Sequence, residues 1–450
     1  MCVTKDIQTG EVKVWKRPDE QNQEELREYL SKYILVGHNF LWFDCAALNR
    51  LCKTQIDPER VIDTLVVSRL VNSWDYNRHG LADWGERLNL PKGDFFDFSR
   101  LSQEMIAYCI RDVEVTEKVF NFLKSTILDP RWKDSMRNEH RAAILSTEMH
   151  YNGFPFDVKK AEELYKQIEE ERRLLNIEIQ EAFPPKSVLL REINPIPTKT
   201  GKIHSKDFRW LDGLPEDNGY IVDSPFSLFE FEPFNPSSTK QCIERLNEFG
   251  WKPTEKTKGH IKAERDRDYE KLEAYKKTGW TISEENLNTL PPSAPPAAHK
   301  LVRYILLSRR LTTLNEWLAA YNPKTQCIHG EIKPIGTWTH RAAHKNPNTG
   351  NIIRIQNDPE TKEVLWGEKG GWGADYRSLW TVKPGWKLVG CDAEGIQLRV
   401  LAHYMEDEEF TQALVSGSSK DETDVHSLNR KKLNNSKTIC KTRNDAKTFS

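Results

Sequence analysis

The segment of residues 381–405 constrains the fold most, because it reads as a buried strand followed directly by a helix. Residues 387–391 are typical of a buried strand, and Asp392 comes at its carboxyl end. From Ile396 to Tyr404, apolar residues recur at helical spacing. An aspartate between a strand and a helix is well placed to hold Mg²⁺ and phosphate oxygens above a sheet. It is equally suited to cap the helix, and this segment alone does not separate the two interpretations.

The first part of the chain alternates strand-like and helix-like runs. Residues 11–15 and 33–38 are rich in residues that favour short strands. Residues 100–123 show the period of a helix, with Ile106, Cys109, Val113, Thr116 and Phe120 on one stripe. This alternation predicts an α/β layer over about the first 125 residues.

The next part of the chain reads as long helices separated by turn-rich and charged stretches. Two helices over residues 134–182 are expected to break at Gly153 and Pro155. Residues 184–230 read as irregular surface. Residues 254–297 are charged and end in a proline-rich run, which predicts a linker or an exposed loop.

Composition excludes several classes of protein. The 450 residues suggest two to four domains of about 150 residues each. With 14 Trp, 13 Tyr and 18 Phe, the chain is not disordered over most of its length. No run approaches the ~18 apolar residues of a membrane span, so no membrane partner is expected. The 8 cysteines form no C-x-x-C pair, which argues against a zinc ribbon or a disulfide framework and predicts a cytoplasmic protein.

Charge is balanced overall but divided near the carboxyl end. The chain has 66 basic and 67 acidic residues. The charged residues of 405–424 are all acidic except Lys420, and those of 429–447 are all basic except Asp445. Such blocks are consistent with two solvated faces. They are also consistent with an acidic surface that binds cations beside a basic surface that binds anions, an arrangement that polyphosphate chemistry requires.

Two cations near the carboxyl end favour the second interpretation. Arg443 and Lys447 lie four residues apart on one predicted helical face, where like charges cost about 0.2–0.5 kcal/mol without a partner. A nucleoside triphosphate bound between the two cations would remove this repulsion and would be attracted by both charges. Asp424 begins another predicted helix with His426 in its first turn. This histidine could donate to a phosphate or sugar, although a lone helical histidine is more often structural.

Four runs in this part of the chain, taken in order, carry a resemblance to a known family. They are THRAAHKNPNTGNI, DAEGIQLRVLAHYM, DVHSLN and TRNDAKTF. Together they resemble family A (Pol I-like) DNA polymerases, and most closely the replicative enzymes of podovirus-type phages. The first run is similar to the family's template-contacting stretch and the second to its first metal-binding motif. The last two are similar to the start of its fingers helix.

The resemblance implies roles for individual residues. Asp392 resembles the family's first metal-binding, catalytic aspartate, and the backbone carbonyl of Ala393 resembles the neighbouring ligand. Arg443 and Lys447 look like the pair that grips the incoming triphosphate, and His426 resembles a histidine that contacts it. The implied cofactor is Mg²⁺, with two ions in each active site.

Three further residues match or depart from the family pattern. Arg341 and Asn348 lie where the family contacts primer–template DNA, through backbone and minor-groove contacts that do not read sequence. Gln397 stands where the family usually has a glutamate that screens against a ribose 2′-hydroxyl. Glutamine has nearly the same size and keeps an acceptor, so we expect it to contact the nucleotide and preserve sugar discrimination.

A second cluster of residues predicts a proofreading site. Asp44 follows a strand-like run, and Tyr108 and Asp112 lie one helical turn apart. Each aspartate alone is more typical of a helix cap or a surface charge. Beside the polymerase resemblance, these residues resemble the second and third motifs of a DEDD-type 3′–5′ exonuclease. Asp44 and Asp112 would then be catalytic metal ligands and Tyr108 would orient the attacking water, while Asp63 matches a residue of the phage pattern.

Both ends of the chain depart from the family. The family's first exonuclease motif, Asp-x-Glu, is absent before Asp44, and the chain stops at Ser450 before the family's second catalytic aspartate. One carboxylate does not hold both metals of a phosphoryl transfer, so we expect neither polymerisation nor proofreading from this chain alone. A partial reading frame, one half of a split polymerase and a protein that has lost catalysis are the three explanations.

The predicted fold class is α/β and α+β, in several domains. Residues 1–130 form a partial RNase H-like exonuclease domain, residues 131–330 a helical thumb with a charged insertion, and residues 331–450 an incomplete palm with the start of the fingers. The predicted function is template-directed DNA synthesis with proofreading. A non-catalytic DNA-binding fragment and a stand-alone exonuclease are the alternatives. The expected partners are primer–template DNA, dNTP, a carboxyl-terminal complementing chain and a processivity factor, for which residues 254–297 are the expected docking place.

Overall fold

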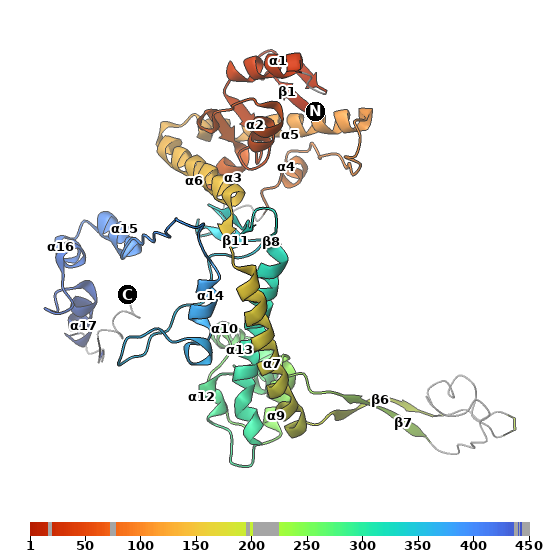
Figure 1. Cartoon of the computed structure of the whole chain (residues 1–450), viewed down its shortest axis with the longest axis vertical. Coiled ribbons are helices and arrows are strands. Elements are labelled where there is room, and N and C mark those ends of the chain that lie inside the picture. The colour runs from red at the N-terminus through yellow and green to blue at the C-terminus, as the bar shows by residue number, and fades with distance from the viewer. Residues whose placement is uncertain are drawn as a thin grey trace. The chain divides into compact units, whose positions relative to one another are not determined.

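The computed structural model describes residues 1–16, 20–72, 78–194, 199–200, 225–435, 440 and 442. It has a mixed α/β structure in which most of the regular elements are helices. The chain divides into two compact units, Met1–Lys383 and Pro384–Ser450 (Figure 1). Among the described residues, no helix combines the length and the apolar content that crossing a membrane requires.

The first part of the first unit alternates strands and helices. Its elements are β1 (Cys2–Lys5), β2 (Val12–Trp15), α1 (Glu20–Ser31), β3 (Leu35–Gly37), α2 (Asp44–Cys52), η1 (Pro58–Arg60), β4 (Val61–Asp63), α3 (Thr64–Asn72), α4 (Leu81–Arg87) and α5 (Gln103–Ile127). Strands β1 and β2 form an antiparallel hairpin, and β3 pairs in parallel with β4. The predicted strands at 11–15 and 33–38 and the alternation with helices are therefore confirmed.

Helix α5 confirms the helix predicted over residues 100–123. Its buried residues are Val115, Val119 and Leu123, which pack against α3 and α4. The five residues that share one stripe at helical spacing are half-buried. The neighbouring helices therefore decide which side of α5 is buried.

The two predicted long helices break where expected. The elements here are η2 (Pro130–Trp132), α6 (Lys133–Asn152), β5 (Phe154–Pro155) and α7 (Val158–Ala182). Gly153 ends α6 with a φ of +66°, and a Cβ at this position would lie 2.7 Å from the ring of His329. The Asp157 side chain then accepts the backbone N–H of Lys160 at 3.1 Å and caps α7.

Residues 184–230 are not irregular throughout. They contain β6 (Lys186–Ile193) and, with residues up to 232, β7 (Phe226–Glu232). These strands pair antiparallel with a register shift between Leu189 and Arg191. The alternation of apolar and polar residues in 226–232 is the signal that the turn-rich composition concealed.

Residues 254–297 are not a linker, which corrects the prediction. They carry α10 (Lys258–Asp266), α11 (Tyr269–Thr278), α12 (Glu284–Leu287) and the start of η3 (Pro296–Lys300). Asn286 is fully buried among them. Its Oδ1 accepts the backbone N–H groups of Thr254 and Glu255, each at 2.8 Å, and its Nδ2 donates to the carbonyl of Thr281 at 2.8 Å. The buried Asn286 amide therefore links the backbone of residues 254–255 to that of Thr281 through hydrogen bonds.

The main core of the first unit forms where α13 (Leu301–Ala320) packs along α7 (Figure 1). Its largest buried side chains include Trp317 of α13, Phe183 and Tyr376. The other elements are α9 (Thr239–Asn247), β8 (Tyr321–Asn322), β9 (Cys327–Ile328), β10 (Glu331–Lys333), β11 (Ala343–Lys345), η4 (Gly367–Gly370) and α14 (Gly373–Ser378). The antiparallel β10–β11 hairpin contacts α6, so it lies against the helix that follows the amino-terminal layer.

The second unit contains α15 (Ile396–Met405), α16 (Glu408–Ser416) and α17 (Val425–Asn435). The helix predicted after Asp392 is therefore confirmed. The strand predicted at 387–391 is wrong, because these residues are irregular and exposed, with Val389 86% exposed. A strand needs a hydrogen-bonded neighbour, and the described residues of this unit contain no other strand to pair with it.

Candidate functional site

Asp392 lies in the irregular segment that leads to α15. Its side chain and Ala393 are exposed. The first helical turn is preceded by Gly395 as the N-cap residue, and no side chain caps it. The Asp392 carboxylate therefore does not cap α15, and the capping interpretation of this residue is wrong.

Two predicted nucleotide contacts lie on helices of the same unit. Gln397 is exposed in the first turn of α15. His426 is half-buried in the first turn of α17, where the Asp424 carboxylate accepts its backbone N–H at 3.0 Å and the Ser427 hydroxyl at 2.7 Å. Asp424 thus begins this helix as predicted. Arg443 and Lys447 lie outside the described residues.

The acidic and basic blocks of this unit pair with each other. Arg430 and Lys431 of α17 lie 2.7 and 3.8 Å from carboxylate oxygens of Glu422. Lys432 lies 3.1 Å from Glu409 of α16. These pairs favour the interpretation of two solvated faces for this part of the blocks, because the cations already have carboxylate partners.

The predicted primer–template contacts lie in and after the β10–β11 hairpin. Arg341 is exposed in its connecting turn, where its backbone N–H donates to the Thr337 hydroxyl at 3.1 Å. Asn348 is also exposed, and its Oδ1 accepts the N–H groups of Gly350 and Asn351 at 3.0 and 3.2 Å. The Asn348 side chain therefore shapes a turn, and Arg341 lies exposed in another one.

The predicted proofreading residues share one region of the amino-terminal layer. Asp44 is the first residue of α2, and Tyr108 and Asp112 lie on α5. Burial, together with the negative charges of Asp63 and Asp112, raises the pKa of Asp44 to about 6. The electrostatic influence of Asp112 on Asp44 places the two predicted metal ligands close enough to interact.

Lys92 completes this cluster and was missed from the sequence. Its ammonium lies 3.1 Å from a carboxylate oxygen of Asp112 and 4.9 Å from the ring centroid of Tyr108. Burial raises the pKa of Asp112, and Lys92 opposes this shift. Lys92 precedes α5 by a loop, so only the tertiary structure brings it to these residues.

Asp63 has a different task from Asp44. Its side chain is buried at the end of β4 and accepts the backbone N–H groups of Asn39, Leu41 and Leu65 at 2.9, 3.1 and 2.9 Å. It thereby fixes the loop between β3 and α2, which carries Asp44. Asp63 is a positioning residue.

The carboxylates do not assemble a two-metal site by themselves. Among the described residues, no three His, Cys, Asp or Glu side chains gather so that they could hold a metal ion. Asp44 and Asp112 offer two carboxylates, and Lys92 already pairs with one of them. Two-metal phosphoryl transfer needs several converging carboxylates, so this set of residues does not fit such a centre.

The sequence matches the profile of the DNA polymerase family A over residues 221–450, which is just over half of the chain. The chain therefore belongs to the family A DNA polymerases, a family of DNA nucleotidyltransferases. It is 28% identical over 504 aligned residues to the DNA-directed DNA polymerase of Escherichia phage T7, covering 92% of this chain and 67% of that protein. The figures for the polymerase of Enterobacteria phage T3 are the same.

Two other similar proteins match a smaller share of this chain and of their own length than the phage polymerases do. DNA polymerase I of Chloroflexus aurantiacus is 30% identical over 162 residues, which is 36% of this chain and 15% of that protein. A solved polymerase domain of Pol1 from M. smegmatis, in complex with DNA primer–template and dNTP, is 15% identical with a TM-score of 0.49. That match covers 86% of this chain and 53% of the solved chain, so this chain spans about half the length of that domain.

Proposed function

We propose that this chain supplies the DNA-binding part and the first catalytic motif of a DNA-directed DNA polymerase that replicates phage DNA. The observation that carries the proposal is the family match over residues 221–450, which includes the four ordered runs around Asp392. In this proposal primer–template DNA and dNTP are its partners, and residues 1–130, 131–330 and 331–450 correspond to the exonuclease-like, thumb and palm regions.

In this proposal each site residue keeps a separate task. Asp392 and the carbonyl of Ala393 are ligands for the magnesium ion, which when bound supplies charge stabilisation at the transferring phosphoryl group. His426, Arg443 and Lys447 hold the triphosphate, and Gln397, at the start of α15, discriminates the sugar. Arg341 and Asn348 contact the primer–template. The exposure of Asp392 and its freedom from a helix cap support its assignment as a ligand.

Nucleotide incorporation on a primed template tests the proposal. The chain is assayed alone and with a second chain that supplies the family's remaining palm and fingers segment. We expect incorporation in the mixture, because the second chain supplies further carboxylates for a two-metal centre. Failure of the mixture to extend any primer, with both chains folded, would contradict the proposal.

A non-catalytic DNA-binding protein is the second candidate. No described residues gather into a metal-binding group. This candidate predicts salt-dependent duplex binding without turnover under any complementation. A third candidate is a 3′–5′ exonuclease role for Asp44 and Asp112. Degradation of single-stranded 3′ ends that is lost in Asp44→Ala would support that role.

A further inference from the structure

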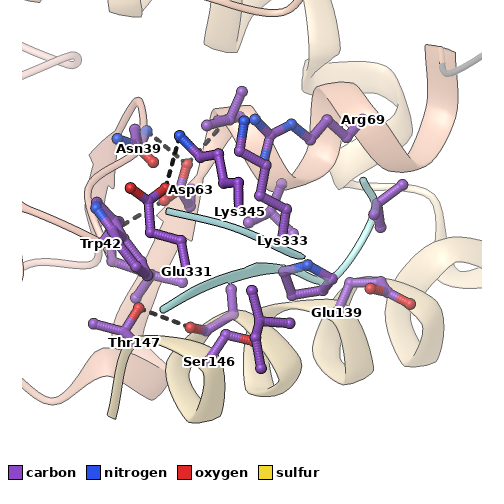
Figure 2. A pocket seen from close by; sticks show the side chains of 17 residues that line it. Asn39, Trp42, Asp63, Arg69, Glu139, Ser146, Thr147, Glu331, Lys333 and Lys345 are labelled. Carbon is purple, nitrogen blue, oxygen red and sulfur yellow. Dashed lines mark hydrogen bonds and ion pairs between the residues drawn. The ribbon is translucent and has the colours of Figure 1, made fainter. Parts of the chain in front are cut away.

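A cavity of about 280 Å³ lies in the first unit where three parts of the chain meet (Figure 2). Its walls come from the loop before α2, from α3 and α6, and from the β10–β11 hairpin. It therefore joins the amino-terminal layer to the hairpin that carries the predicted primer–template contacts. Leu41, Trp42 and Ile335 are among its apolar walls, and the lining also holds three acidic and three basic side chains.

Three cations from three elements line this cavity. Arg69 comes from α3, Lys333 from β10 and Lys345 from β11, and Figure 2 shows their head groups turned toward one another. Lys345 lies 2.7 Å from a carboxylate oxygen of Glu331. Within the described part of the chain, Arg69 and Lys333 form no ion pair with a carboxylate. Burial lowers the pKa of Lys333, and the charges of Lys345 and Arg69 lower it further. The cations therefore repel one another.

The acids of the cavity do not remove this repulsion. Both carboxylate oxygens of Asp63 already accept backbone N–H groups, although its charge still attracts Arg69. Glu331 is occupied by Lys345 and by Asn346, whose Nδ2 donates to it at 2.9 Å. Figure 2 shows the Glu139 carboxylate on the far side of the cavity from the three cationic head groups.

We propose that this cavity binds a phosphate group of the bound DNA strand, with Arg69 and Lys333 as its ligands. This inference rests on the proposed DNA-binding function and extends it to a site that joins two regions of the chain. A guanidinium and an ammonium on one anion combine a two-pronged contact with a point charge. The source of the phosphate is a strand rather than a free ion, because Lys345 belongs to the same hairpin as the exposed Arg341.

Binding of labelled primer–template DNA, measured by fluorescence anisotropy at several salt concentrations, tests this site. The variants are Arg69→Gln and Lys333→Gln, and the matched control is Lys324→Gln, which removes an exposed cation from the turn between β8 and β9. Each test variant should weaken binding about fivefold and reduce the slope of log K against log salt by about one. The control should change neither quantity.

Thermal unfolding separates loss of the site from loss of the fold. Lys333→Gln should leave the unfolding midpoint of the free chain unchanged or higher, because it removes like-charge repulsion. Inorganic phosphate should raise the midpoint of the wild-type chain less than the DNA does. Unchanged DNA affinity in both variants would overturn the site, as would phosphate stabilisation of the wild type without any effect of the variants on DNA. Absence of DNA binding by the wild-type chain would instead contradict the proposed function.

Discussion

The ammonium of Lys92 lies 3.1 Å from a carboxylate oxygen of Asp112, on the face of α5 that also carries Tyr108. The other carboxylate oxygen of Asp112 is buried and has no hydrogen-bond partner among the described residues. The ammonium of Lys92 therefore opposes the burial that raises the pKa of Asp112. It also occupies a direction from which a cation would otherwise approach Asp112.

Replacing Lys92 should change the titration of Asp112. In Lys92→Met the burial that raises the Asp112 pKa is no longer opposed by an ammonium, so this pKa should rise further. Carboxylate chemical shifts followed by NMR during a pH titration measure the change. Lys124→Met, which removes an exposed cation from the same helix, is the control. An unchanged Asp112 titration in Lys92→Met would show that the pair has no electrostatic effect.

Asp44 should make the stability of the chain depend on pH. Its pKa in the folded chain is about 6, against an ordinary value of 3.8. The folded state thus holds more protons than the unfolded state between these values, so the free energy of unfolding falls as the pH rises from about 4 to about 6. Asp44→Asn removes this loss and should stabilise the fold at about pH 7 by about 1–3 kcal/mol.

Urea unfolding at about pH 5 and about pH 7 measures this effect. Asp134→Asn is a suitable control, because the Asp134 side chain is 79% exposed. The stabilisation by Asp44→Asn should be larger at the higher pH, whereas the control should behave as the wild type does. A stabilisation that does not grow with pH would contradict the raised pKa.

Asp63 should matter for folding more than its single charge suggests. Asp63→Ala leaves the three N–H groups of Asn39, Leu41 and Leu65 without their acceptor in a buried place. We expect a loss of about 2–5 kcal/mol in the free energy of unfolding. Asp57→Ala, which removes an exposed cap from η1, should cost only about 1 kcal/mol. Equal losses in urea unfolding of the two variants would argue against the positioning role.

Asn286 should be the most sensitive residue of the segment 254–297. Asn286→Ala removes a fully buried amide whose donors and acceptor are satisfied by backbone groups. We expect a loss of about 2–4 kcal/mol. Asn288→Ala, two residues further along, provides a control outside this network. A loss below that of the control would show that this segment folds independently of the buried amide.

The sequence predicted the places where the backbone is constrained by local chemistry. Gly153 and Asp157 fix the end of one helix and the start of the next, and both act through atoms of nearby residues. The helix after Asp392 was likewise predicted from its period. These features depend on propensity and on hydrogen bonds within a few residues, so the linear pattern is enough to reveal them.

Features that depend on distant neighbours were not predicted correctly. The run 387–391, predicted as a strand, has no strand beside it among the described residues. Lys92 reaches Asp112, and Arg69 reaches the cavity of Lys333, only through tertiary packing. Charge and periodicity are visible in a sequence, but the partner of a charge is set by the fold.

We propose that Asp392 serves nucleotide transfer in the assembled polymerase. Primer extension by the chain together with its complementing segment measures this most directly, with Asp392→Asn compared against Glu394→Gln, an exposed acid in the same irregular segment. We expect Asp392→Asn to lower incorporation by about a thousandfold or more while duplex binding persists, and Glu394→Gln to extend primers as the wild type does. Equal extension by Asp392→Asn and the wild type would show that the Asp392 carboxylate has no part in nucleotide transfer.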